Sequence, residues 1–312
     1  SSNRTGSSPL TLILTGIPGV AVSSPWLALP LCCLYLLMLL GNCSLLWAIS
    51  AEPALHTPMF QLLSMLALAD LGLSLCTLPT VLAVSCAPAA PLPFRACLAQ
   101  MYFIHTFSAI ESGLLVAMAF DRFVAVCHPL RYGSVLSGSL VARAGVLIVL
   151  RATCLVLPVA VLMARRPLCR ARALSHPFCL HQDVLRLACG DLRPSSWYGL
   201  GAVLLTEGLD SLAILLSYAL ILRAALAAAA PGARAKALAT CTCHLCAVLL
   251  FYVPLISLSL IHRFGKHLSP LAPALLADVC LLLPPALNPL VYSWRTQRLR
   301  RRILLLLCRS GA

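Results

Sequence analysis

Long apolar runs constrain this chain more than any other feature. Seven stretches each supply the roughly 20 mostly apolar residues that a helix needs to cross a bilayer. They cover residues 25–49, 58–84, 97–126, 140–163, 197–226, 237–261 and 270–292. Only 10% of the residues are charged and 61% are hydrophobic, whereas soluble domains carry about 25% charged residues. The sequence therefore predicts an all-α membrane protein, one bundle of seven transmembrane helices.

The ends of the chain suggest an orientation. An odd number of spans places the two ends on opposite sides, and positively charged short segments stay in the cytoplasm. Arginines cluster in the tail, and Asn3-Arg4-Thr5 is a glycosylation acceptor that fits an outer N-terminus. We therefore expect a plasma-membrane protein with residues 1–24 extracellular, residues 25–292 in the transmembrane bundle and residues 293–312 cytoplasmic.

The tail has a second pattern. Leu299 and Ile303 share one helical face with Leu306 or Leu307, while arginines occupy the other. This pattern is typical of a short amphipathic helix on a membrane surface, attracted to anionic lipids. Cys308, near the end of this helix, is a candidate for palmitoylation.

Four cysteines are candidates for disulfides on the expected outer face. Cys97 stands at the outer end of the third span, and Cys169, Cys179 and Cys189 stand in the long loop of residues 164–196. On an oxidising face four cysteines predict two disulfides, and the spacing alone leaves three connectivities open.

Other function classes find little support in the sequence. The soft ligands Cys241, Cys243, His244 and Cys246 share a helical face only in i, i+3 pairs, so we expect no zinc or copper site there. The sequence contains no recognisable set of a nucleophile and a general base, so it does not indicate an enzyme. A transporter is expected to show paired broken helices, and a channel a selectivity filter or charged rings; neither pattern is evident, and nothing indicates nucleic-acid binding.

Several motifs in family order carry a resemblance. "MAFDRFVAVCHPLRY" at 118–132 resembles the olfactory-receptor signature of rhodopsin-like G-protein-coupled receptors. "LHTPMF", "KALATCTCHL" and "LNPLVY" follow the same family, and "HTFSAIESG" and "FYVPLISLSLIHRFG" resemble its class I, or fish-like, branch. The resemblance covers almost the whole chain. It implies an odorant receptor that activates a stimulatory, olfactory-type G protein and raises cyclic AMP. A chemosensor for small acidic metabolites outside the olfactory epithelium is the alternative.

The resemblance also assigns roles to the polar residues in the spans. It implies that Asp121 holds Arg122 in an inactive rotamer and that activation frees the arginine. Phe123 departs from the usual tyrosine, which removes one hydroxyl. Three tyrosines complete the expected switch: Tyr252 beside the kink at Pro254, and Tyr292, which is expected to reach toward Tyr218. The implied disulfides are Cys97–Cys179 and Cys169–Cys189.

Asp70, Glu111 and Asn288 form a second expected group. In receptors that resemble this chain, these positions surround a sodium ion. Two neighbouring carboxylates in a low dielectric require a cation or a retained proton. Both a sodium ion and a protonated pair without an ion remain open, and no other cofactor is expected.

The ligand should bind nearer the outside. His105 lies eight residues after Cys97, and Ser259 and Arg263 share a helical face at i, i+4. His181 and Gln182 follow Cys179 and would be carried over the pocket by its disulfide. The expected apolar walls are Val156, Val159, Gly199 and Val203. A guanidinium suits a carboxylate, so we expect Arg263 to anchor a short or medium-chain carboxylic acid.

Overall fold

The computed structural model describes residues 10–15, 25–87, 89–169, 173–174, 176–227, 231–264, 269 and 271–309. Asn3 lies outside these residues. The helices are α1 (Pro25–Ala51), η1 (Pro53–Leu55), α2 (Pro58–Cys86), α3 (Phe94–Cys127), η2 (Pro129–Arg131), α4 (Tyr132–Val135), α5 (Gly138–Ala164), α6 (His181–Leu187), α7 (Arg193–Val203), η3 (Leu204–Gly208), α8 (Leu209–Ala227), α9 (Pro231–Phe264), α10 (Leu271–Arg295) and α11 (Gln297–Arg309). The strands are β1 (Thr11–Leu14), β2 (Ala90–Pro93) and β3 (Ala173–Leu174).

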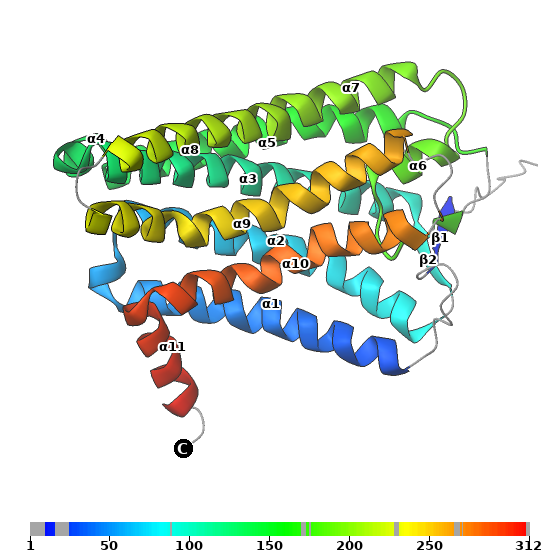
Figure 1. Cartoon of the computed structure of the whole chain (residues 1–312). Coiled ribbons are helices and arrows are strands. Elements are labelled where there is room, and N and C mark those ends of the chain that lie inside the picture. The colour runs from blue at the N-terminus through cyan, green and yellow to red at the C-terminus, as the bar shows by residue number, and fades with distance from the viewer. Residues whose placement is uncertain are drawn as a thin grey trace, which may run out of the picture.

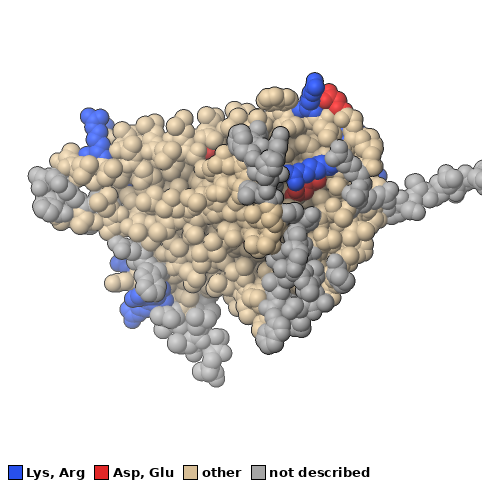
Figure 2. Space-filling view, turned by 45° about the vertical axis from the view of Figure 1, so that its right-hand side comes forward, with Lys and Arg blue, Asp and Glu red and all other residues tan. Residues whose placement is uncertain are grey.

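The long helices lie side by side in one bundle (Figure 1). Helix α3 packs against α2, α5 and α8, and α10 packs against α1 and α9. Helices α4 and α11 lie at one end of the bundle, and the strands and α6 lie at the other (Figure 1). Most of the charged side chains in view gather near these two ends, and the flank between them is largely uncharged (Figure 2).

Within the described residues, six helical segments are long and apolar enough to cross a membrane. They are Leu29–Ala51, Pro58–Cys86, Gly138–Ala164, Arg193–Ala227, Cys241–Ile261 and Leu271–Ser293. The remaining long helix, α3, spans 34 residues and carries Arg95, Glu111, Asp121 and Arg122. The apolar criterion therefore finds six of the seven predicted spans.

The segment Arg193–Ala227 is less regular than its apolar pattern predicts. A π-helical segment, η3, interrupts it between α7 and α8. A π-turn contains an extra residue, which changes the faces that the following side chains present, and such turns often occur at functional sites. The sequence predicted one uniform helix here.

A small sheet lies at the end of the bundle opposite α4 and α11 (Figure 1) and was not predicted. Strand β1 pairs antiparallel with β2 and parallel with β3. Leu12 and Leu14 of β1 are fully buried against residues of α3 and the long loop, among them Cys97 and Cys179. The sheet thus joins the N-terminal segment to two loops at that end.

Candidate functional site

Asp121 organises the end of α3 that lies near α4. The guanidinium of Arg122 forms an ion pair with Asp121, and its Nε donates to Asp121 Oδ2 at 2.9 Å. The hydroxyl of Tyr132 donates to the other carboxylate oxygen at 2.7 Å. Burial and the adjacent carboxylate raise the pKa of Tyr132, so its phenol remains a donor. The sequence predicted no role for Tyr132, although this residue is the last one of the signature that contains Asp121.

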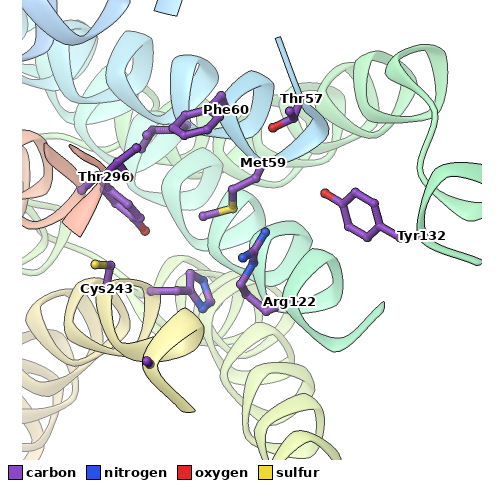
Figure 3. Close-up of a pocket in the computed structure, with 11 residues that line it drawn as sticks. Thr57, Met59, Phe60, Arg122, Tyr132, Cys243 and Thr296 are labelled. Atoms are coloured by element: carbon purple, nitrogen blue, oxygen red, sulfur yellow. The ribbon is translucent and has the colours of Figure 1, made fainter. Parts of the chain in front are cut away.

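A cavity of about 430 Å³ opens beside this pair. Arg122 and Tyr132 point toward one another at its edge, near Met59 and Thr57 (Figure 3). Its lining also includes Cys243, His244, Tyr292 and Thr296. Phe123 lies outside this lining and packs edge-on against His128, with 5.6 Å between ring centroids. Phe123 therefore makes an aromatic contact at this position, although it lacks the hydroxyl of the usual tyrosine.

Tyr218 and Tyr292 do not meet in this structure. The Tyr218 hydroxyl lies 2.6 Å from His244 Nδ1, and His244 Nε2 lies 3.0 Å from the carbonyl of Leu115. Because a carbonyl only accepts, Nε2 carries the hydrogen and Nδ1 accepts from Tyr218. The Tyr292 hydroxyl is buried and has no hydrogen-bond partner among the described residues. In this conformation the Tyr218 hydroxyl contacts His244 and forms no hydrogen bond with Tyr292, so the expected reach of Tyr292 toward Tyr218 stays a prediction.

Asp70, Glu111 and Asn288 lie together in the interior. Asn288 Nδ2 donates to Asp70 Oδ2 at 3.0 Å, and the Asp70 and Glu111 carboxyl groups are close enough to interact directly. All three residues are at least 96% buried. Within the described chain, Glu111 Oε1 and Asn288 Oδ1 have no hydrogen-bond partner. Such oxygens suit either a hard cation or a shared proton.

A second buried polar network, which the sequence did not predict, involves Ser112, the residue after Glu111. Arg151 of α5 donates through both terminal nitrogens to Asp210 of α8, at 2.7 and 2.5 Å. Ser112 of α3 donates to Asp210 Oδ2 at 2.8 Å and lies 2.7 Å from the Tyr252 hydroxyl of α9. The Asp210 carboxylate thereby links α8 directly to α5 and α3, and Ser112 extends the network to α9. The available signal was two residues of opposite charge inside predicted spans, where unpaired charges are costly.

The long loop is fastened over the N-terminal end of α3. Disulfides join Cys97 to Cys179 and Cys169 to Cys189, the pairs that the resemblance implied. Gln100 of α3 accepts a hydrogen bond from the backbone N–H of Cys179 at 2.9 Å. The loop therefore has both a covalent and a polar attachment to α3.

Three of the predicted ligand residues lie together beneath this loop. The backbone N–H of His181 donates to His105 Nε2 at 3.3 Å. The His181 ring packs so closely on Gly199 that a Cβ there would lie 2.6 Å from the ring Cε1. His181 is buried, and its Nε2 has no hydrogen-bond partner among the described residues. A neutral imidazole with an unused nitrogen thus faces α3 and α7.

The other predicted ligand residues are less closely grouped. Val156 and Val159 are buried on α5, and Gln182 and Ser259 are half-buried. Val203 is 39% exposed and precedes the exposed Leu204 and Leu205. Val203 lies one turn after Gly199 and shares a helical face with it at i, i+4, so its place in the pocket wall stays a prediction. The side chains of Arg263 and Cys308 lie outside the described part of the chain.

We expect the loop around His181 to loosen as the pH falls from about 6.5 toward 4. Burial lowers the pKa of His181 to about 4. An exposed histidine takes up its proton near pH 6.5, so the buried neutral form stabilises the closed loop at higher pH and loses that contribution as the pH falls. Hydrogen exchange of residues 176–188, corrected for intrinsic rates, should show about tenfold less protection near pH 5 than near pH 7. His181→Gln should remove the difference, and equal protection in the parent at both pH values would contradict the assignment.

Comparison with known proteins agrees with this architecture. A model of the olfactory receptor family matches residues 31–310. Human olfactory receptor 51G2 is 48% identical over 306 residues, which cover 98% of both chains. Human olfactory receptor 51L1 is 51% identical over 292 residues, covering 94% of this chain and 93% of that receptor. Mouse olfactory receptor 51E2 is 46% identical over 294 residues, covering 94% and 92%. The chain therefore belongs to the olfactory receptor family of G-protein-coupled receptors, which are multi-pass membrane proteins and not enzymes.

Proposed function

We propose that this odorant receptor binds a short or medium-chain carboxylic acid near the outer end of its bundle and activates a stimulatory, olfactory-type G protein that raises cyclic AMP. The observation that carries the proposal is the grouping of His105, His181 and Gly199 beneath the disulfide-fastened loop. Ser259 stands on the outer part of α9, one turn before Arg263. An arginine at this position offers a bidentate partner for a carboxylate.

The proposal includes the membrane topology. Helix α3 is taken as a seventh transmembrane helix, because it runs along the other long helices (Figure 1) and its acids are buried by them. The N-terminus, β1 and α6 then lie outside the cell, and α4 and α11 lie in the cytoplasm. Leu299 of α11 is buried, whereas Arg298, Arg300 and Arg301 are exposed. This supports α11 as the short amphipathic helix that contacts anionic lipids.

A route from ligand to G protein runs through Tyr252. This residue lies on α9 below Ser259 and beside Pro254, which interrupts the helical hydrogen bonds. A ligand-induced shift of α9 would disturb the Ser112–Tyr252 contact and open the far end of α9. The Asp121–Arg122 pair is the proposed switch there, with Tyr218 and Tyr292 around the same region. A sodium ion held by Asp70, Glu111 and Asn288 is proposed to favour the inactive state.

Cyclic AMP in cells that express the receptor tests the function directly. Straight-chain acids of increasing length are compared with the matching alcohols, at equal surface expression. Acids should activate and alcohols should not. Arg263→Ala should weaken the response to acids by at least about tenfold, equivalent to about 1.4 kcal/mol of head-group contact. An unchanged response in this variant would contradict the head-group assignment, and silence toward every acid would contradict the ligand class.

A further inference from the structure

Glu207 is an acid in the bundle interior that neither the proposed switch nor the proposed head-group site uses. It belongs to η3, the π-helical segment, which packs against α3. The neighbouring Leu204, Leu205 and Leu209 are exposed, whereas Thr206 and Asp210 are buried. Glu207 lies within electrostatic range of Tyr252 on α9 and Cys280 on α10. Its carboxyl group therefore lies on the side of the segment that carries Thr206 and Asp210, toward the bundle and away from the leucines.

The charge of Glu207 has no partner within the described residues. Arg151, a nearby cation, uses both terminal nitrogens on Asp210. Glu207 takes part in no hydrogen bond or ion pair in that part of the chain, yet it retains some accessible surface. An unpaired carboxylate at bilayer depth is costly, and acids there are usually paired or line a functional cavity. A group from outside the chain can supply the missing partner.

The depth of Glu207 fits the floor of the proposed odorant site. Ser112 and Tyr252 mark the level of Asp210. Glu207 lies three residues further out than Asp210, about 4.5 Å at 1.5 Å per residue. His105 lies seven residues further out than Ser112, about 10 Å on the same scale. Glu207 is therefore about 6 Å deeper than His105 and faces the same interior.

We propose that Glu207 is the inner anchor of the odorant site, selecting small acids that carry a hydrogen-bond donor, an ammonium or a hydroxyl, at the end remote from the carboxylate. The inference rests on the proposed function, because that function assigns the carboxylate of the ligand to α9 and leaves the opposite end of the ligand for Glu207. A carboxylate accepts hydrogen bonds from both donors, and a protonated carboxyl still accepts through its carbonyl oxygen. A plain alkyl tail would leave Glu207 desolvated without a partner, which disfavours binding.

The test compares three six-carbon acids: hexanoic, 6-hydroxyhexanoic and 6-aminohexanoic acid. Cyclic AMP potency and thermal stabilisation of the purified receptor are measured for the parent, Glu207→Gln and Glu207→Leu. The parent should prefer the two donor-bearing acids. Glu207→Gln should lose the preference for the ammonium and keep that for the hydroxyl. Glu207→Leu should reverse the order, with a change of about tenfold in relative potency. Leu205→Met, on the exposed side of the same segment, should change nothing.

Hexylamine and hexanol separate the two proposals. If no acid acts but either compound binds the parent and not Glu207→Leu, the acidic head is wrong and the inner anchor stands. If acids act through Arg263 and their order is the same in the parent and Glu207→Leu, the inner anchor is wrong and the proposed function stands. If none of the five compounds binds or activates the parent, both proposals fail.

Discussion

Asp210→Asn is expected to remove most of the folded receptor from the cell surface. The substitution leaves the Arg151 guanidinium in the bundle without its counter-charge, and it weakens the acceptor that holds Ser112. Breaking a buried ion pair by removing one partner costs about 3–5 kcal/mol. Since 33% of the Arg151 side chain is exposed, we expect about 3 kcal/mol, the lower end of that range. The melting temperature of the purified receptor and its surface level in cells measure the effect.

A double variant shows whether the uncompensated charge is the cause. Arg151→Met together with Asp210→Leu removes both charges, and such apolar replacement is often neutral. The double variant should therefore be closer to the parent than Asp210→Asn is. Glu52→Gln is the matched control, because it removes one partner of the more exposed Glu52–Arg302 pair and should cost less than about 1 kcal/mol. Normal stability of Asp210→Asn would contradict a stabilising role for this pair.

The apolar pattern predicted most of the bundle because a run of about 20 apolar residues strongly favours a membrane-spanning helix. It did not predict η3, because a π-turn changes the backbone spacing without interrupting the apolar composition. It also did not predict the small sheet of β1, β2 and β3. Strand β1 has four residues. Strand β3, which pairs with it, is far away in the sequence and lies within the long loop. Pairing between such distant short segments depends on the tertiary structure.

The predicted sites differ in the same way. Asp70 and Asn288 are 218 residues apart in the sequence, and the resemblance indicated correctly that they lie together. Arg151 and Asp210 belong to none of the motifs that carry the family resemblance. Their ion pair could therefore be recognised only from the three-dimensional structure. Tyr218 was assigned a partner by resemblance, but His244 is its nearer hydrogen-bond partner in this conformation. Residue type and membrane depth identified which polar residues require partners, and packing decided which partners they have.

Asp121→Asn is expected to raise cyclic AMP in cells that receive no odorant. Asp121 is fully buried and binds both Arg122 and Tyr132, so it fastens the C-terminal part of α3 to α4 and holds the guanidinium against its own helix. An asparagine cannot balance the charge of Arg122, and hydrogen bonds to charged groups contribute about 1.5–3 kcal/mol. If about 2 kcal/mol of this favours the inactive state alone, the ratio of active to inactive receptor rises roughly thirtyfold.

Tyr132→Phe separates the two contacts of Asp121. It removes one hydrogen bond to the carboxylate and keeps the ion pair, so the basal signal should rise much less than in Asp121→Asn. Surface expression is matched in each case, because a destabilised receptor would lower the signal for another reason. If Asp121→Asn signals like the parent at equal expression, the ion pair contributes equally to both states. A contact with equal strength in both states shifts no equilibrium, and the switch would then have to lie elsewhere, first of all at the Tyr218–His244 contact.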